Sequence, residues 1–313
     1  MLHISSQALA SALNHSQVID AIKQQFLQDY EMPDRHHHFY RAGQKQENTL
    51  LLMPAWNARY MGVKQVISAP GNARLSLPSI QGTYTLMDAQ SGVPLAVMDA
   101  RRLTAVRTAC ASALASRYLA REDAKTLLII GGGQVALHLI PAHLAVRNYD
   151  QVWVWTRRAE AFQDFKEELG DVRVPVKQAM DLEAAVRQSD VISAATLSET
   201  PLIQGDWLQP GQHLDLIGSF KKHMREADDS AIVKSRLYVD TLYGALHESG
   251  ELGIPLQKGL ITADDVQGDL PGLCRGKDKG RGDAREITLF KSVGMAIEDL
   301  AAAILVYQKC QHG

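Results

Sequence analysis

The sequence is poor in cysteine, in long apolar runs and in net charge, and each shortage excludes a class of protein. It contains 3 cysteines in 313 residues. Cys110, Cys274 and Cys310 lie far apart and fit no CxxC or zinc spacing, so we expect neither a disulfide framework nor a metal site. The consecutive histidines 36–38 are interpreted as a solvated segment, because adjacent side chains diverge in any regular backbone.

Apolar runs of membrane-spanning length and an excess of one charge sign are also missing. No run approaches the roughly 18 to 20 apolar residues that cross a bilayer, and the first residues lack a basic region followed by an apolar one. The formal net charge of -2 and the pI of about 6.6 give no footprint for nucleic acid or an anionic membrane. We therefore expect a cytoplasmic protein without nucleic-acid or membrane partners. A hydrophobic content of 46% over this length suffices for two domains.

The most informative stretch is a strand, a glycine turn, a helix and a second strand. An apolar run at 125–130 leads into the turn GGGQVA, and a second apolar run follows at 152–155. In this fingerprint Gly131 allows the tight turn, Gly133 lets the backbone approach a pyrophosphate, and the small Ala136 permits close packing of helix on strand. The phosphate charge rests on the helix N-terminus. The pattern predicts a dinucleotide-binding site.

The end of the second strand bears on the choice of cofactor. Thr156, Arg157 and Arg158 stand where NAD enzymes usually carry an acidic residue for the ribose 2′-hydroxyl. Two guanidinium groups and a hydroxyl suit a 2′-phosphate, so we expect NADP in preference to NAD. These arginines also fit a solvated helix start, which keeps NAD as an alternative. The expected cofactor-binding residues are Gly131, Gly133, Gln134, Val135, Thr156, Arg157, Arg158, Ala195, Thr196, Ser292 and Gly294.

Strand and helix patterns alternate from Asp123 to about Asp240. The expected strands lie at 127–130, 152–155, 172–176, 190–195, 214–217 and 237–239. Such alternation requires a parallel sheet with right-handed crossovers, and hence a doubly wound α/β domain. Pro141 is expected to kink the first helix of this domain, because its ring clashes with the carbonyl four residues back.

The remaining sequence has a different texture. The first hundred residues contain short β-type runs separated by Gly, Pro and Asn, after two helical stretches. A helix from Ala105 to Ala120, capped by Thr104, then links the two domains. Residues 264–286 mix Gly, Pro and alternating charge and are expected to form a mobile surface loop. A final helix is expected to pack on a core, since apolar residues recur at helical spacing over 289–305.

Three basic residues are candidates for binding a substrate carboxylate. Lys64 shares a strand face with apolar Val66, which would hold its ammonium against a core. Arg107 falls in the first turn of the expected helix after Thr104, where the helix dipole already favours an anion. Arg35 is the third candidate. Each taken alone also fits an ordinary surface charge, because Lys and Arg are mostly exposed.

Four blocks of the sequence resemble the ornithine cyclodeaminase and μ-crystallin family of NAD(P)-dependent proteins. They are Leu52-Met53-Pro54 with Lys64 downstream, the T-x-x-R-T-A block at 104–109, the glycine turn, and the T-x-F-K-S-x-G-x-x-x-E-D block at 288–299. They span most of the chain in the family's order. Alanine dehydrogenases of the archaeal type and ketimine reductases share this family.

The resemblance implies a domain organisation and roles for the basic residues. It implies a Rossmann-type dinucleotide-binding domain over residues 114–294. It also implies a discontinuous α+β domain for substrate binding and dimerisation, made of residues 1–113 and 295–313. Within that domain the catalytic residues Arg35, Lys64 and Arg107 would bind the substrate carboxylate, and the protein would be a homodimer.

Two departures from the family pattern bear on the substrate. Ornithine cyclodeaminases carry an acidic residue shortly after a strand and a second one just before the Met-Pro pair; here these places hold Phe220 and Leu51. The two apolar side chains would leave a substrate's second ammonium unpaired, which disfavours ornithine by several kcal/mol, on the order of the cost of burying an unpaired polar group.

We therefore expect an NADP(H)-preferring oxidoreductase that reduces a cyclic ketimine or a related α-imino acid. Three alternatives stay open. The first is an ornithine cyclodeaminase in which another acid, such as Asp240, replaces the missing one. The second is an open-chain amino acid dehydrogenase, including one for alanine. The third is a binding protein that keeps the nucleotide site without catalysis.

Overall fold

The computed structural model describes residues 1–43, 46–75 and 77–312. The chain divides into two compact units. Unit 1 consists of Met1–Arg107 and Met295–Gly313, and unit 2 of Thr108–Gly294. Among the described residues, none of the helices combines the length and the apolar character that a membrane span requires.

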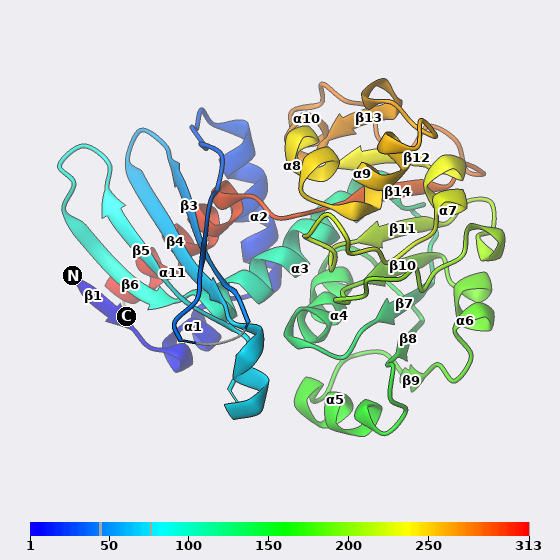
Figure 1. The fold of residues 1–313 in the computed structure, drawn as a ribbon, viewed down its shortest axis with the longest axis horizontal. Helices are drawn as coiled ribbons and strands as arrows, with labels where there is room; N and C mark the ends of the chain where they lie inside the picture. The colour runs from blue at the N-terminus through cyan, green and yellow to red at the C-terminus, as the bar shows by residue number, and fades with distance from the viewer. Residues whose placement is uncertain (44–45, 76, 313) are drawn as a thin grey trace. The chain divides into compact units, whose positions relative to one another are not determined.

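Unit 1 is built on a six-stranded mixed sheet (Figure 1). The sheet order is β1-β6-β5-β4-β3-β2, with β1 parallel to β6 and the other pairs antiparallel. The elements are β1 (Leu2–Ile4), α1 (Ser6–Ala12), α2 (His15–Leu27), β2 (His36–Tyr40), β3 (Asn48–Trp56), β4 (Tyr60–Ser68), β5 (Ile80–Asp88), β6 (Pro94–Asp99) and α11 (Ala296–His312), with a 3-10 turn at Pro70–Leu75. Helix α11 packs on β3, β4 and β5 and against α2.

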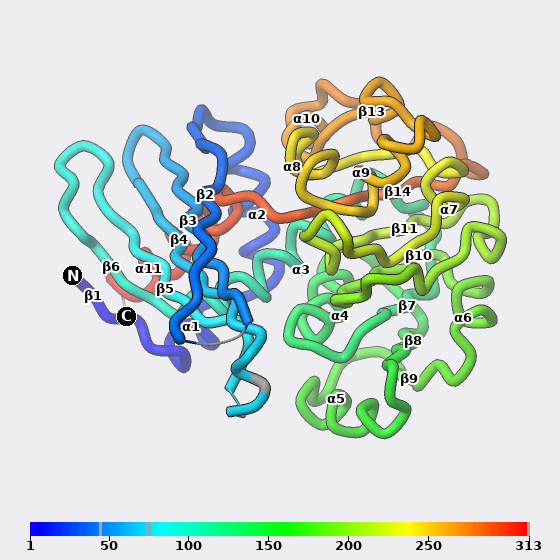
Figure 2. The backbone as a smooth tube through the Cα atoms, in the orientation of Figure 1, coloured from blue at the N-terminus to red at the C-terminus, as the bar shows by residue number. Residues whose placement is uncertain are grey.

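Unit 2 is built on an eight-stranded, all-parallel sheet, whose labelled strands are drawn in Figure 1 and whose backbone path is traced in Figure 2. The order is β13-β12-β14-β11-β10-β7-β8-β9. The strands are β7 (Thr126–Ile130), β8 (Gln151–Trp155), β9 (Val176–Gln178), β10 (Val191–Ala194), β11 (His213–Leu216), β12 (Arg236–Val239), β13 (Val266–Asp269) and β14 (Thr288–Lys291). The helices are α4 (Gln134–Val146), α5 (Ala161–Leu169), α6 (Leu182–Gln188), α7 (Asp229–Lys234), α8 (Leu242–His247), α9 (Gly250–Gln257) and α10 (Leu270–Arg275), with 3-10 turns at Gly205–Trp207 and Ala263–Asp265.

The two sheets confirm the predicted fold class, a doubly wound α/β domain combined with an α+β domain. The central strands β7, β10, β11 and β14 of unit 2 are buried over nearly their whole length, because a parallel sheet is covered on both faces. Leu128, Ile130, Ile192 and Leu214 are fully buried in its core. In unit 1 the burial alternates along β4, as expected for an antiparallel strand with one covered face.

The strand order of unit 2 reverses at β7. From β7 the chain builds outward through β8 and β9, and it then returns to place β10 on the other side of β7. In open α/β sheets ligands bind beyond the carboxyl ends of the strands at such a reversal. The glycine turn follows β7 directly, so the fold puts it at this position.

Several predicted boundaries were wrong. The linking helix α3 (Ala100–Leu119) begins five residues before Ala105, so Thr104 lies inside it and Asp99 accepts the Arg101 N–H at its start. Residues 289 and 290 belong to β14, and α11 begins only at Ala296. A short buried strand of parallel type is as apolar as a helix face, which explains the second error. Helix α4 continues through Pro141.

Residues 264–286 do not form the mobile loop that was predicted. Strand β13 and helix α10 occupy much of this range. After α10 the chain is fixed by Arg281, whose guanidinium donates to the carbonyl oxygens of Leu119 at 2.7 Å and Gln212 at 2.9 Å. One partly buried arginine thereby holds a segment whose composition disfavours secondary structure.

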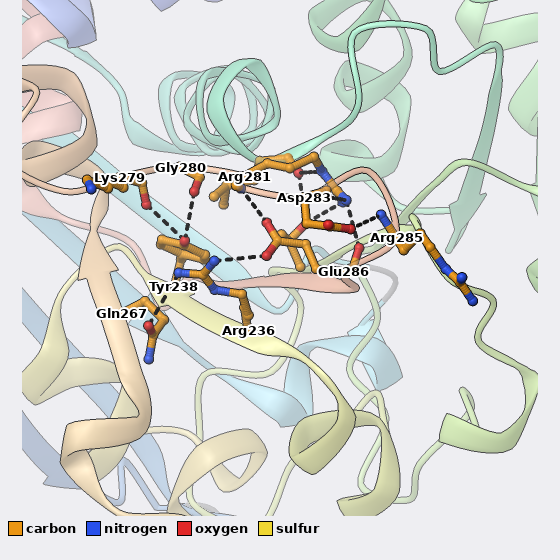
Figure 3. A network of polar contacts seen from close by, with 12 residues as sticks. Arg236, Tyr238, Gln267, Lys279, Gly280, Arg281, Asp283, Arg285 and Glu286 are labelled. Carbon is orange, nitrogen blue, oxygen red and sulfur yellow. Dashed lines mark hydrogen bonds and ion pairs between the residues drawn. The ribbon is translucent and has the colours of Figure 1, made fainter.

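Figure 3 shows the rest of this network. The Tyr238 hydroxyl donates to the carbonyl oxygens of Lys279 and Gly280, and Arg236 forms an ion pair with Glu286 at 2.8 Å. Composition indicates a loop here, but it carries no information about these partners, which lie up to 50 residues away in sequence.

Candidate functional site

Lys64 and Arg107 come together in unit 1, in a buried ionic cluster with Glu298 and Asp299 of α11. The Lys64 ammonium lies 2.7 Å from Asp299 Oδ2. Arg107 Nε lies 2.8 Å from Asp299 Oδ1, and Arg107 Nη1 lies 2.7 Å from Glu298 Oε2. All four side chains have exposed fractions of 4% or less. Two carboxylates at hydrogen-bond distance offset the desolvation of two buried cations.

Strand register brings Lys64 to this cluster. Lys64 pairs directly with Met53 of β3 and with Tyr84 of β5, so the three side chains lie on one face of the sheet. The sequence prediction that Lys64 shares a face with apolar residues is therefore confirmed. The explanation offered for Arg107 was wrong: it is the eighth residue of α3, so its charge is balanced by carboxylates and not by a helix N-terminus.

Burial and neighbouring charges shift the pKa of both cations. Burial lowers the pKa of Lys64 to about 8; Asp299 opposes this change, while Arg107 and Arg35 add to it. Burial also disfavours the charged form of Arg107, but Asp299 and Glu298 outweigh it and raise the pKa of Arg107. Arg107 is thus a permanent charge, whereas Lys64 is poised to lose its proton just above neutral pH.

Arg35 adds a third positive charge. It lies one residue before β2, is partly buried, and acts electrostatically on Lys64. Together with the ionic cluster, three cations face two carboxylates. Their guanidinium and ammonium groups are donors that suit the binding of a carboxylate. These are the three residues that the sequence selected as a carboxylate site.

Sequence reasoning missed the two acids and a tyrosine. Glu298 and Asp299 belong to the T-x-F-K-S-x-G-x-x-x-E-D block. Their position at the start of an apolar helix was the available signal that they are buried beside cations. Tyr84 is fully buried, and among the described residues its hydroxyl has no hydrogen-bond partner. Burial and Asp299 raise its pKa, so it stays protonated. A Cβ on Gly62 would lie 1.8 Å from this hydroxyl, which explains the glycine.

The two departures from the family pattern fall in different units. Leu51 lies on the same face of β3 as Met53 and hence on the face that carries Lys64. Phe220 lies in the segment after β11, partly buried, with the Lys221 ammonium 5.8 Å from its ring centroid. Both positions of departure from the family pattern therefore carry an apolar side chain.

In unit 2 the glycine turn has the geometry that the fingerprint requires. Gly131 has φ +135°, and its N–H donates to the Trp155 carbonyl oxygen at 2.9 Å. A Cβ at Gly131 would lie 2.7 Å from the Ala195 carbonyl oxygen. Gly133 caps α4 without a hydrogen bond from any described side chain, and a Cβ there would meet no atom of the described residues within 4 Å. The turn therefore exposes uncapped backbone amides to open space.

Several other predicted nucleotide residues gather around this turn. A Cβ on Gly132 would lie 3.2 Å from Thr156 Cγ2, and the Thr156 hydroxyl donates to the Arg158 carbonyl oxygen. Arg157 and Arg158 are exposed. Val135, the second residue of α4, is partly buried. Gln134, at the start of α4, donates to Glu168 at 2.7 Å.

Ser292 and Gly294 are placed further away along the same sheet edge. They follow β14, which β11 and β10 separate from β7. Asp240 Oδ2 accepts hydrogen bonds from the Ser292 hydroxyl and from the Val293 and Gly294 N–H groups, at 2.6 to 2.8 Å. Asp240 Oδ1 accepts from the N–H of the next residue. This carboxylate is committed to holding the turn after β14.

Among residues 1–43, 46–75 and 77–312 there is no group of three or more His, Cys, Asp and Glu side chains placed to hold a metal ion. The consecutive histidines lie on the exposed edge strand β2, a strand that the sequence did not predict.

Known proteins resemble this chain over its whole length. It is 36% identical to the Δ1-pyrroline-2-carboxylate reductase of Colwellia psychrerythraea, over 98% of each chain. Its structure matches that of the Thermococcus litoralis Δ1-pyrroline-2-carboxylate reductase in complex with NADH and L-proline, with 33% identity, a TM-score of 0.93 and coverage of 100% and 98%. It also matches an archaeal alanine dehydrogenase dimer with bound NAD, with 29% identity, a TM-score of 0.92 and coverage of 100% and 96%.

The family model for ornithine cyclodeaminase and mu-crystallin matches residues 3–313. The match covers both sheets, the ionic cluster and the glycine turn, and it confirms the resemblance that the four sequence blocks carried. The chain belongs to the ornithine cyclodeaminase/mu-crystallin family.

Proposed function

We propose that the protein is an NAD(P)H-dependent reductase of α-imino acids, and that a cyclic ketimine such as 1-pyrroline-2-carboxylate is its substrate. The observation that carries the proposal is that Lys64 and Arg107 come together, with Arg35 acting on Lys64, beside a sheet face where Leu51 stands in place of an acid. Such a site suits a substrate with one carboxylate and no second ammonium. Relatives named as Δ1-pyrroline-2-carboxylate reductases support this assignment.

The residues of unit 2 fit a nicotinamide dinucleotide. The uncapped amides at Gly133 and the open space around it suit a pyrophosphate. Gly131, Gln134 and Val135 would complete the turn, and Ala195 and Thr196 would extend the site along the strand ends. The exposed guanidinium groups of Arg157 and Arg158 suit a 2′-phosphate, so we expect NADPH to bind better than NADH.

In the proposed reaction, unit 1 binds the substrate and unit 2 binds the cofactor. Arg107 and Lys64 hold the carboxylate while Glu298 and Asp299 fix their side chains. Since an ammonium has three N–H donors, the bond from Lys64 to Asp299 leaves two for a substrate. Orienting the imine in this way supplies most of what hydride transfer requires of a protein.

The chemistry adds a hydride and a proton across one double bond. A reduced nicotinamide bound at the glycine turn would supply a hydride to C2 of the imine, whose C=N bond would become a C–N single bond. The imine nitrogen takes a proton, for which Lys64, with its pKa lowered to about 8, is the candidate donor. The product is a cyclic α-amino acid, and the cofactor leaves in its oxidised form.

Conversion of ornithine is disfavoured, because apolar residues stand where ornithine cyclodeaminases carry acids. The two places that hold carboxylates in ornithine cyclodeaminases are Leu51 and Phe220, and Asp240 already accepts four hydrogen bonds. Burying a substrate ammonium against apolar side chains costs several kcal/mol, on the order of an unpaired polar group.

An open-chain amino acid is the second candidate substrate, because an archaeal alanine dehydrogenase shares the fold closely. A carboxylate site of this kind does not by itself distinguish a ring from a short open chain.

We also propose a homodimer, since that alanine dehydrogenase is described as a dimer. Sedimentation at micromolar concentration is expected to give about twice 34.4 kDa. A mass of one chain over the whole concentration range would contradict the dimer.

The test compares three substrates on the purified protein. NADPH oxidation is expected with 1-pyrroline-2-carboxylate, much slower oxidation with pyruvate and ammonium, and little ammonium release from ornithine. Efficient conversion of ornithine to proline would return the protein to the cyclodeaminases, and efficient use of pyruvate would make it an open-chain dehydrogenase. Tight nucleotide binding without turnover of any substrate would favour a binding protein.

A further inference from the structure

Two buried glutamates of unit 2 lie at the sheet edge beside the glycine turn, and the proposed chemistry does not use them. Glu226 and Glu251 are both fully buried. Glu226 precedes α7 and Glu251 lies in α9. They approach the ends of β10, which is next to β7, and of β11, which is next to β10 (Figure 1). Carboxylates are almost never fully buried without a strong reason.

Glu226 ties the segment after β10 to the segment after β11. Its Oε1 accepts the Thr196 N–H at 2.6 Å and the Thr196 hydroxyl at 2.9 Å. Its Oε2 accepts the N–H groups of Gly218 at 2.7 Å and Ser219 at 3.3 Å. The two oxygens of one carboxylate thus hold together two loops that are separate in the sequence.

The two loops are packed closely where Glu226 holds them. A Cβ on Gly218 would lie 2.1 Å from the Thr196 carbonyl oxygen and 2.5 Å from Glu226 Oε1. The backbone of Thr196 therefore has no room to move toward Gly218, and its N–H is fixed by the glutamate. Thr196 follows β10 at the strand-order reversal, where a nucleotide is expected to bind.

A second acid and a lysine surround Glu226. Glu251 accepts the Glu226 and Ala227 N–H groups, at 3.0 and 2.8 Å, and the Ser219 hydroxyl at 2.8 Å. Lys291 of β14 donates to the carbonyl oxygen and the hydroxyl of Ser219, at 2.7 Å each. Glu251 from α9 and Lys291 from β14 are the charged groups that act on Glu226.

We propose that Glu226 is a positioning residue for the nucleotide site: its ionised carboxylate holds Thr196 and Gly218 in the arrangement that binds the cofactor, and its protonation releases one of them. The proposal rests on the proposed function, in that it assumes a nucleotide at this edge. A carboxylate accepts hydrogen bonds at both oxygens, whereas a carboxylic acid carries a donor on one. Protonation therefore places a donor O–H opposite the N–H donors of one of the two loops, and the hydrogen bonds to that loop are weakened.

Burial and the neighbouring charges determine the pH range in which Glu226 changes its protonation state. Burial raises the pKa of Glu226 to about 7, Lys291 opposes the rise, and Glu251 adds to it. Below this pH the carboxyl is protonated and nucleotide binding is weak; above it the carboxylate forms and binding is tight. Affinity for the cofactor is thus expected to rise with pH through neutrality.

The experiment measures nucleotide affinity by fluorescence titration of the full chain between about pH 5.5 and 8.5. NADH is the probe, because the 2′-phosphate of NADPH itself titrates near pH 6. For the wild-type chain the affinity for NADH is expected to rise at least about fivefold across this range, as one proton is released on binding. Glu226→Gln, which keeps the shape and removes the charge, is expected to bind at least about tenfold more weakly at high pH, with a flat pH profile.

Glu251→Gln is the matched variant. It removes a negative neighbour, so the midpoint of the profile is expected to move to lower pH while tight binding at high pH is kept. A flat wild-type profile, a Glu226→Gln profile like that of the wild type, or an unmoved midpoint in Glu251→Gln would each overturn the proposal. Should Glu226→Gln fail to fold, the midpoint of Glu251→Gln still decides. A wild-type chain that binds neither NADH nor NADPH at any pH would overturn the proposed function as well.

Discussion

The ionic cluster of unit 1 and the glycine turn of unit 2 prepare for an anion in opposite ways. In the cluster, long side chains carry the charge, and Glu298 and Asp299 hold Arg107 and Lys64 at 2.7 to 2.8 Å. At the turn, backbone groups take this role: Gly133 leaves its space open, and no side chain of the described residues caps the amides of α4.

The difference shows two solutions to the problem of burying charge. Side-chain cations are expensive to desolvate and need permanent counter-ions, so their site must be built from distant parts of the chain. Backbone amides carry only partial charge, and a local turn with a helix behind it suffices. Variants of the ionic cluster should therefore destabilise the fold, whereas a variant that fills the open space at Gly133 should only block nucleotide binding.

The largest effect is expected for Arg107→Ala. It leaves Glu298 and Asp299 buried with one cation fewer, which is expected to lower the free energy of unfolding by about 3 to 5 kcal/mol. Turnover of the imino acid is expected to fall at least about a hundredfold through loss of orientation. Denaturant unfolding and steady-state kinetics measure the two effects.

Arg101→Ala is the control on the same helix. Arg101 is exposed and its ion pair with Asp99 is 3.7 Å long, so the free energy of unfolding should change by less than about 1 kcal/mol. If Arg107→Ala were equally mild, the cluster would not be the charged core of unit 1.

Gly133→Ala is expected to separate binding from folding at the turn. The added methyl group meets no atom within 4 Å in the described part of the chain, so thermal unfolding should be unchanged. The nucleotide Kd should rise at least about thirtyfold, because the pyrophosphate loses its space. Gly131→Ala should impair both properties, since it combines φ +135° with a Cβ 2.7 Å from the Ala195 oxygen. Unchanged affinity in Gly133→Ala would remove the pyrophosphate from this turn.

Arg157→Asp tests the choice of cofactor. A charge-assisted contact to a 2′-phosphate contributes about 1.5 to 3 kcal/mol, so NADPH is expected to bind at least about tenfold more tightly than NADH, and the variant should reverse the order. Arg187→Asp, an equal charge change at an exposed position of α6, should leave the preference unchanged. Equal affinities of the wild-type chain for the two nucleotides would contradict the prediction.

The smallest effect concerns pH. With its pKa lowered to about 8, Lys64 loses its charge above that pH, so KM for the imino acid should rise several-fold between about pH 7 and 9. Lys64→Arg keeps the charge and should flatten this profile. The same shift makes folding stability increase with pH from about 8 toward 10.5, the ordinary pKa of a lysine, because the unfolded chain retains the proton that the native chain has lost.

A pH profile of KM that is identical in the wild-type chain and in Lys64→Arg would exclude Lys64 as the titrating group. The comparison of the two sites would then rest on Arg107 alone.

Local patterns in the sequence were sufficient for the turn and the fold class. The spacing of Gly131, Gly133 and Ala136 between two apolar runs specifies the strand, turn and helix, since each residue acts on its immediate neighbours. Leu289 and Phe290 could not be assigned to a strand in this way, because a buried parallel strand has no periodicity to distinguish it from a helix.

The sequence by itself determined which residues carry charge, which turn exposes its amides, and that strands and helices alternate. Only the tertiary structure decided that Asp299 meets Lys64 across 235 residues, and that Glu226 holds Thr196 and Gly218 together. The physical reason is that a buried charge is stable only beside a partner. The identity of that partner depends on strand register and helix packing, which no local pattern specifies.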